Sequence, residues 1–239
     1  MNRTVAVIQA RTGSSRLPGK VLMPIRGSQS ILDHQCRRLK TISGVNELVI
    51  ATTEAPADDD IAAIGRRHGV RVVRGSTEDV LSRFVTAARL TLADTLVRIT
   101  SDSPLRDPWV IERCVAHHHE QNLEYTRPAP GALPKGMRAE VIQASVLRQI
   151  DSDPDTTPRE REHVTVRIRE HPDRYRTGAP DFPERLAHPD FDLSVDTLED
   201  LRFVRGLQDE LAARGWAEDV HHICQVLEDG AAERIRARA

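Results

Sequence analysis

The residues best suited to chemistry lie in a loop near the N-terminus, Arg11-Thr-Gly-Ser-Ser-Arg-Leu-Pro-Gly-Lys20, directly after the apolar run Val5-Ala-Val-Ile8. Glycine leaves backbone N–H groups open to a ligand, serine adds small hydroxyl donors, and the three cations supply fixed positive charge. Together these groups can hold a polyphosphate. The loop is not a P-loop, because its glycines are one residue too far apart and Val21 stands where that motif has Ser or Thr. The alternative is a solvated Gly/Ser turn after an edge strand, which does not explain the crowding of cations.

Two aspartates are candidate ligands for a divalent cation. Asp102 and Asp196 each come directly after an apolar, strand-like run. A carboxylate at the end of a buried strand can hold Mg²⁺, a hard cation that prefers oxygen ligands and substrate phosphates. Each also has a structural alternative, since Asp102 could stabilise its turn and Asp196 could form a capping box with Glu199. Thr197 and Asp200 can supply that cap instead, which would leave Asp196 free.

The order of strand-like and helix-like segments predicts an α/β fold that brings these side chains together. Strands are expected at Val5–Gln9, Leu48–Thr52, Val70–Val73 and Leu96–Thr100, with helices at about 30–42, 57–68, 77–91 and 108–121. This alternation predicts a mostly parallel sheet covered on both faces. Ligands bind at the carboxyl ends of the strands in such sheets. The loops at 10–20, 52–56, 74–79 and 100–107 are therefore expected to meet at one crevice.

The second half of the chain is less regular, being rich in proline and charge from about 123 to 195. We expect loops at 126–136 and 178–190 around a helix near 158–170, whose start is marked by the cap Thr157-Pro-Arg-Glu160. A strand at Phe191–Val195 and helices at about 197–213 and 217–228 should follow. The tail after Gly230 is expected to fray.

Composition excludes several classes of protein. The chain has 239 residues, 39% of them hydrophobic, enough for one substantial core. A net charge of -2 lacks the basic excess of a general nucleic-acid binder. No apolar stretch approaches the roughly 18–20 residues of a membrane span, and no signal-peptide pattern is present. Three widely spaced cysteines suggest neither a disulfide framework nor a zinc cluster. A cytoplasmic enzyme with neither nucleic-acid nor membrane partners is expected.

The motifs together resemble the cytidylyltransferase family that includes the spore-coat polysaccharide biosynthesis protein F, which is related to the CMP-Kdo and CMP-sialic acid synthetases. The family's first motif, Arg-x-Gly-Ser-x-Arg-Leu-Pro-Gly-Lys, is matched in full by Arg11 to Lys20. The similarity continues in order to about residue 210. It passes through Ala51-Thr-Thr53, Arg74-Gly-Ser76, Asp79-Val-Leu81, Val97-Arg-Ile-Thr100, Arg161-Glu-His-Val-Thr165 and Val195-Asp-Thr197.

The resemblance implies a three-layer α/β/α, Rossmann-like fold of the nucleotide-diphospho-sugar-transferase type, with a mixed, mostly parallel sheet, and a reaction using CTP and Mg²⁺. It places the cytosine and ribose beside Gln9, Ala10, Arg11, Ala51, Thr52 and Thr53. It places the triphosphate at Gly13, Ser14, Arg16 and Lys20, and the metal at Asp102 and Asp196. Lys20, Arg16 and Arg11 are the implied catalytic cations, and the nucleotide-binding set is completed by Arg74, Gly75, Asp79 and Thr100.

On the acceptor side, the resemblance implies roles for Lys135, Arg138, Glu140, Arg161 and His163. It also implies a single domain and a homodimer. The domain would have a nucleotide-binding half at 1–122, an acceptor-binding and dimerisation half at 123–215, and a C-terminal helix and tail at 216–239.

The chain departs from the family's pattern in Pro134-Lys-Gly-Met-Arg-Ala-Glu140. The family typically has arginine where this chain has Lys135 and an acid where it has Arg138. A carboxylate able to accept hydrogen bonds from sugar hydroxyls has thus become a cation. We therefore expect a small acceptor that is more anionic, or less sugar-like, than usual. Candidates are a sugar acid, a phosphate or a phosphonate.

Three other functions fit parts of this pattern. A glycosyltransferase of related architecture would bind a nucleotide-sugar, but such enzymes usually carry an Asp-x-Asp pair, and this chain has Ser101-Asp102-Ser103. A non-catalytic nucleotide-binding regulator would not need both acids and Lys20. A nucleotidyltransferase that uses another nucleoside triphosphate also remains open, because only the resemblance favours CTP.

Overall fold

A seven-stranded sheet in the order β5-β4-β1-β6-β8-β7-β9 forms the centre of the computed structural model, which describes residues 2–40 and 42–237. Strands β1 (Thr4–Gln9), β4 (Glu47–Thr53), β5 (Arg71–Gly75) and β6 (Thr95–Thr100) pair in parallel. Strand β8 (Glu140–Gln143) is antiparallel to both β6 and β7 (Tyr125–Thr126), and β9 (Thr177–Gly178) is parallel to β7. The mixed, mostly parallel sheet predicted from the sequence is confirmed. A separate pair is formed by β2 (Pro24–Arg26) and β3 (Gln29–Ser30).

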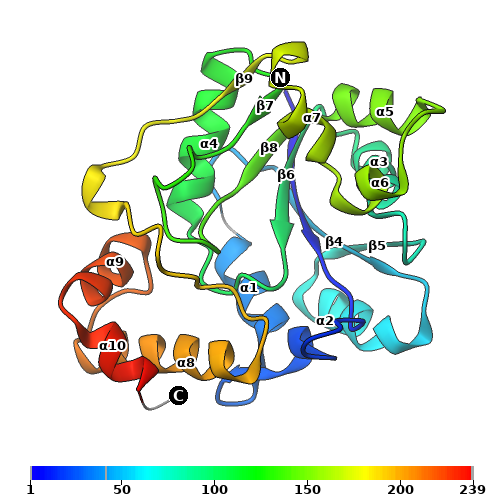
Figure 1. Cartoon of the computed structure of the whole chain (residues 1–239). Coiled ribbons are helices and arrows are strands. Elements are labelled where there is room, and N and C mark those ends of the chain that lie inside the picture. Colours follow the sequence, from blue (N-terminus) through cyan, green and yellow to red (C-terminus); the bar gives the residue numbers. More distant parts are fainter. Residues whose placement is uncertain (1, 41, 238–239) are drawn as a thin grey trace.

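Helices cover both faces of the sheet, because successive side chains of a strand point to opposite faces. Ala6 and Ile8 of β1 belong to a core shared with α1 (Ile31–Leu39), α2 (Asp59–His68) and α4 (Pro108–Glu120). Val5 and Val7 belong to the opposite core, with α3 (Val80–Thr91), α5 (Ala144–Ser152) and α7 (Val166–Glu170). This is the expected three-layer α/β/α arrangement (Figure 1). The C-terminal helices α8 (Leu198–Ala213), α9 (Val220–Glu228) and α10 (Ala231–Arg236) gather beside the first core.

The second half differs from its sequence-based prediction in four ways. The segment 191–195 is not a strand and forms a single bridge, between Lys135 and Asp192. The helix near 158–170 is broken into α6 (Pro158–His163) and α7 at Val164, whose φ is 49°. The segment after Gly230 forms α10 instead of fraying. Strands β7, β8 and β9 and helix α5 were not predicted, because these strands are only two to four residues long and α5 has no side-chain cap.

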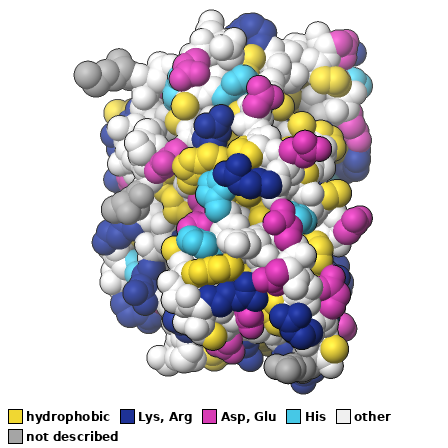
Figure 2. Space-filling model, turned by 90° about the vertical axis from the view of Figure 1, so that its left-hand side faces the viewer, with side chains coloured by type: hydrophobic (Ala, Val, Ile, Leu, Met, Phe, Trp, Pro, Cys, Tyr) yellow, Lys and Arg dark blue, Asp and Glu magenta, His cyan; other side chains and the backbone are white. Residues whose placement is uncertain are grey.

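The surface carries charges of both signs. On the face shown in Figure 2, acidic and basic side chains are interspersed with histidines and hydrophobic groups, without a continuous patch of either charge. Within the described ranges, no helix has both the length and the apolar character needed to cross a bilayer.

Candidate active site

The glycine-rich loop after β1 is held by three anchors. Buried Asp58 accepts hydrogen bonds from the backbone N–H of Thr12 at 2.8 Å and from its hydroxyl at 2.6 Å. Leu17 is buried in the core. Gly19 takes a left-handed φ of 70°, which suits glycine, and its N–H bonds the Thr12 carbonyl at 2.9 Å. The anchors fix the loop's path while leaving Gly13 and Ser14 to line a cavity.

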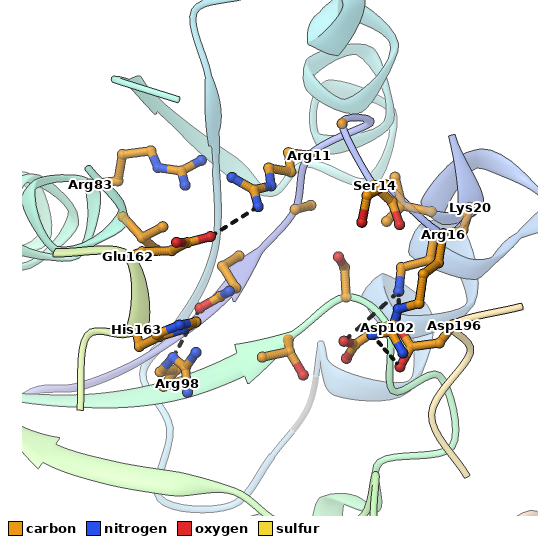
Figure 3. Close-up of a pocket in the computed structure, with 18 residues that line it drawn as sticks. Arg11, Ser14, Arg16, Lys20, Arg83, Arg98, Asp102, Glu162, His163 and Asp196 are labelled. Carbon is orange, nitrogen blue, oxygen red and sulfur yellow. Dashed lines mark hydrogen bonds and ion pairs between the residues drawn. The ribbon is translucent and has the colours of Figure 1, made fainter. Parts of the chain in front are cut away.

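Lys20 follows this loop and lies between the two candidate acids. Its side chain is 10% exposed, and its Nζ lies 2.8 Å from Oδ1 of Asp196 and 4.0 Å from Oδ2 of Asp102. Nζ also donates to the carbonyl of Val195 at 2.7 Å. Arg16 contacts the second oxygen of Asp196 at 2.8 Å. The two acids and two cations therefore form one cluster (Figure 3).

The two acids come from distant parts of the chain and are joined by the backbone. Asp102 follows β6, while Asp196 precedes α8, and the N–H of Val195 donates to the Asp102 carbonyl at 2.7 Å. Thr197 and Asp200 form the capping box of α8, so the carboxylate of Asp196 is not used as a cap. The prediction that Thr197 and Asp200 can supply this cap in place of Asp196 is confirmed.

A first cavity of about 330 Å³ opens at the carboxyl ends of β1 and β6. Figure 3 shows Lys20, Arg16, Asp102 and Asp196 at one end, Arg83, Glu162, His163 and Arg98 at the other, and Arg11 between them. The structure brings eleven of the predicted site residues to this cavity: Gln9, Ala10, Arg11, Gly13, Ser14, Arg16, Lys20, Thr100, Asp102, His163 and Asp196.

Six residues predicted to bind the nucleotide do not line this cavity. Ala51 is fully buried, and its carbonyl accepts from the N–H of Ala10 at 3.0 Å. The hydroxyls of Thr52 and Thr53 donate to Asp58. These three residues therefore contact the groups that hold the glycine-rich loop, Asp58 and the backbone of Ala10.

The other three also make structural contacts. Arg74 donates to the carbonyls of Thr53 and Ala55 and pairs with Asp59 at 2.7 Å. Asp79 caps α3 by accepting from the N–H of Ser82. Gly75 lies against Arg83, whose Cγ would be 2.9 Å from a Cβ added at this position. Gly75 thus leaves room for a buried arginine.

That arginine was not identified from the sequence. Arg83 is 2% exposed, and its Nε and Nη1 have no hydrogen-bond partner among the described residues. Burial lowers the pKa of Arg83, and the nearby charge of Arg11 lowers it further to a smaller extent. Because a buried charge without a partner is costly, this side chain is suited to an anionic or carbonyl-bearing ligand in the first cavity.

A second cavity of about 410 Å³ adjoins the first. Lys135, Arg138 and Glu140, which were predicted to bind an acceptor, all line it. The two cavities share five lining residues: Arg16, Arg98, Thr100, Asp102 and Asp196. A ligand in each cavity would therefore meet its neighbour beside the two acids.

The remaining acceptor predictions are distributed differently. His163 lines the first cavity instead of the second. Arg161 lines neither of the two and pairs with Asp79 at 2.8 Å and Asp151 at 2.9 Å, joining α6 to α3 and α5. Lys135 forms an ion pair with Asp192.

Glu140 is held by several donors. It pairs with Arg98 and accepts hydrogen bonds from the hydroxyls of Tyr125 and Thr165. Burial alone would raise the pKa of Glu140, but the charge of Arg98 and these hydrogen bonds lower it to about 2. Its carboxylate holds Arg98, Tyr125 and Thr165 together at the second cavity. These contacts leave it unable to act as a base near neutral pH.

The donor set fits a divalent cation. In the described part of the chain no group of three or more His, Cys, Asp and Glu side chains gathers as a complete metal site. The pair Asp102 and Asp196 nevertheless converges on one cation, the ammonium of Lys20. Two carboxylates that leave further positions to phosphate oxygens and water are the usual ligands of Mg²⁺ at a substrate.

A model of the family described as Cytidylyltransferase matches residues 5–220. The chain belongs to the cytidylyltransferase family. It is 36% identical over 218 residues to the spore coat polysaccharide biosynthesis protein SpsF of Bacillus subtilis, with 90% of each chain covered. The predicted resemblance is confirmed, and membership makes the protein a nucleotidyltransferase.

Solved structures agree with this cytidylyltransferase assignment. A cytidylyltransferase from Leptospira borgpetersenii superposes with a TM-score of 0.87 at 27% identity, covering 97% of this chain and 96% of its own. A CMP:2-keto-3-deoxy-manno-octonic acid synthetase complexed with CTP superposes with a TM-score of 0.63 at 20% identity, covering 87% and 99%. At that identity the second likeness supports the fold alone.

Other lining residues of this cytidylyltransferase were also missed from the sequence. They are Arg98 and Glu162 in the first cavity, and Arg106, Arg127 and Arg169 in the second. Arg98 and Glu162 stood within quoted motifs, and Arg106 stood within the predicted crevice loop at 100–107, so their positions were the available signal. Arg127 and Arg169 lie outside the predicted crevice loops.

Proposed function

We propose that the protein transfers CMP from CTP to a small anionic acceptor, with Mg²⁺, and releases pyrophosphate. The observation that carries this proposal is the meeting of two cavities beside Asp102 and Asp196. The first contains the glycine-rich loop that suits a triphosphate, and the second suits an acceptor. CTP is favoured by membership of the family and by the structural relative complexed with CTP.

The loop and its cations would hold the phosphates. Gly13 and Ser14 offer backbone and hydroxyl donors, and Lys20 and Arg16 bring positive charge to the end of the cavity nearest the acids. Arg11 is 39% exposed, and its contacts within the described residues are two long ones, at 3.4 Å, with Glu162 and the carbonyl of Thr77. It is therefore free to turn toward the β- and γ-phosphates.

Asp102 and Asp196 would hold Mg²⁺, which would neutralise phosphate charge when bound. The ammonium of Lys20 lies between these acids. Lys20 is anchored to the Val195 carbonyl as well, so its position does not depend on the acids alone. The residues of this chain would thus gather Lys20, Arg16 and the metal at the same end of the first cavity.

In the reaction, an oxyanion of the acceptor attacks the α-phosphorus in line. A bond forms between that oxygen and the phosphorus, while the bond from the α-phosphorus to the oxygen bridging to the β-phosphate breaks. Pyrophosphate leaves with the bonding electron pair. An acceptor oxygen that is already ionised has no proton to lose, so positioning and charge stabilisation by Lys20 and Arg16 suffice.

The second cavity supports an anionic acceptor through its charge. Seven of its lining residues are Arg or Lys, against the three carboxylates of Asp102, Glu140 and Asp196. Arg138, which stands where the family typically has an acid, is one of these cations. Phosphates and phosphonates present the attacking oxyanion directly. A sugar acid would present its carboxylate to the arginines and attack through a hydroxyl, whose proton would pass to water.

The test is to incubate the protein and Mg²⁺ with each of the four ribonucleoside triphosphates and a panel of sugar acids, phosphates and phosphonates. We expect pyrophosphate release with CTP, dependent on both metal and acceptor, together with a CMP conjugate. Release with another triphosphate but not CTP would refute the nucleotide assignment. Hydrolysis that is independent of every acceptor would refute transfer.

A further inference from the structure

The second cavity contains more positive charge than one attacking oxyanion requires. Three of its seven cations are neutralised by ion pairs: Arg16 with Asp196, Arg98 with Glu140, and Lys135 with Asp192. The other four are Arg106, Arg127, Arg138 and Arg169. None of these forms an ion pair with any residue in the described ranges, 2–40 and 42–237.

Arg106 lies at the inner end of this cavity. It is 5% exposed, its Nη2 donates to the hydroxyl of Thr100 at 3.2 Å, and its Nε has no partner among the described residues. Burial lowers the pKa of Arg106 to about 10, although the charges of Asp102 and Glu140 oppose this. The guanidinium therefore stays charged near neutral pH, beside the acids where the two cavities meet.

The other three arginines form a second group, termed here the outer arginines: Arg127, Arg138 and Arg169. They come from the end of β7, the segment before β8, and α7, so three separate elements deliver them to one cavity. They do not line the first cavity, which contains the glycine-rich loop. The phosphates of a nucleotide held by that loop would not reach them.

Arg138 lies in an environment that disfavours its charge. Burial lowers the pKa of Arg138 and the nearby charge of Arg127 lowers it further, although the charge of Asp192 opposes both effects. The Nε of Arg138 is buried without a partner in the described structure. Like charges assembled without counter-charge destabilise a protein, whereas guanidinium groups bind carboxylate and phosphate oxygens in a fixed, bidentate geometry. Such a cluster is best explained by an anion that it binds.

We infer that the acceptor carries two separate anionic groups, one that attacks beside Asp102 and a second that is bound by Arg127, Arg138 and Arg169. This inference rests on the proposed transfer reaction and specifies its substrate. The attacking group must lie beside Asp102 and Asp196, next to Arg106, where the two cavities meet, and this leaves the outer arginines to a second group. A carboxylate, phosphate or phosphonate separated from the nucleophile by a short carbon chain has the required chemistry.

The test uses a series of compounds with a phosphonate at one end and a carboxylate at the other, from phosphonoacetate to 6-phosphonohexanoate. The methyl ester of each carboxylate is its matched control, because the ester removes one charge and keeps the shape. Binding is measured by calorimetry, without CTP. We expect at least one member to bind about tenfold or more tightly than its ester.

Three variants locate the effect. Arg127→Met and Arg138→Met should reduce the preference for the free acid to less than about threefold, and Arg148→Met should leave it intact. Arg148 is an exposed arginine of α5 that lines neither cavity. Thermal melting checks folding, and neither cavity variant should melt lower than wild type, because each loses a repulsive charge. A preference below threefold throughout the series, or one that survives both cavity variants, overturns the inference.

Pyrophosphate release measured in parallel separates this inference from the proposed function. If methylphosphonate supports turnover of CTP as well as every phosphonate-carboxylate compound does, transfer stands and the second anionic group is refuted. If one of these compounds binds more tightly than its ester as expected, but no triphosphate releases pyrophosphate, the anion site stands and the transfer reaction is refuted.

Discussion

Replacing Lys20 by alanine tests the centre of the proposed site. The ammonium lies 2.8 Å from Asp196 and 2.7 Å from the Val195 carbonyl, so the change removes two short charge-assisted contacts. Breaking a buried pair costs about 3–5 kcal/mol when the remaining charge is left without a partner. Here Asp196 keeps Arg16 at 2.8 Å and is 17% exposed, so we expect a loss at the lower end, about 3 kcal/mol.

The same change should affect catalysis more strongly than folding. About 3 kcal/mol corresponds to a fall in melting temperature of roughly 6–12 °C for a chain of this size, which leaves the protein folded at assay temperature. Loss of one donor that stabilises developing charge costs on the order of 10²–10³ in rate. Turnover is followed as pyrophosphate release at saturating CTP, with folding checked by circular dichroism.

Lys40→Ala is the matched control. Lys40 is exposed, and its Nζ makes one contact of 3.3 Å, with the carbonyl of His68. We expect this variant to retain wild-type turnover. A folded Lys20→Ala protein with turnover within about threefold of wild type would refute the charge-stabilising role of Lys20.

Three further predictions address other parts of the site. Asp102→Asn should stay folded, because the side chain of Asp102 is 35% exposed. Its pyrophosphate release should no longer rise with added Mg²⁺, and an unchanged metal response would remove Asp102 from the site. Arg83→Met should raise KM for CTP by about tenfold or more without lowering the melting temperature, since the guanidinium is buried with two unpartnered nitrogens in the described structure; a KM within twofold of wild type contradicts this. The folded-state pKa of Glu140, about 2, lies below its ordinary value of 4.5, so its contribution to stability is complete above pH 4.5 and lost as pH falls toward 2. Urea unfolding midpoints between pH 5 and 3 should therefore fall less steeply for Glu140→Gln than for wild type, and parallel slopes would contradict the assignment.

The parallel half of the sheet could be predicted because its strands carry a clear signal. Strands β1 and β4 are buried on both faces and read as continuous apolar runs. The second half lacks such a signal. Strands β7 and β9 have two residues each, and the pairing of β7 with β8 and of β9 with β7 depends on contacts between distant segments. Register of this kind is set by tertiary packing and not by local pattern.

The site was predictable where the residue type is unusual for its position. Lys20 is a lysine in an arginine-rich chain, and Asp102 follows a buried strand. The two lie in one cluster with Asp196, which was predicted for the same reason although the segment before it is not a strand. Arginines were harder to sort. Arg161 is committed to structural ion pairs, whereas Arg83 and Arg106 are buried without a carboxylate partner in the described ranges. The sequence alone does not show which arginines form ion pairs and which are buried without one, because the burial of a long side chain depends on the elements that pack over it.

The backbone hydrogen bond from Val195 to Asp102 joins two segments that lie far apart in the sequence. Lys20 and Asp102 belong to the first half of the chain, whereas the Val195 carbonyl and the carboxylate of Asp196 come from the segment before α8. The cluster around Lys20 is therefore complete only after this later segment has packed against the loop that follows β6. Local folding of the parallel strands alone would leave Lys20 with Asp102 and without its two shorter contacts.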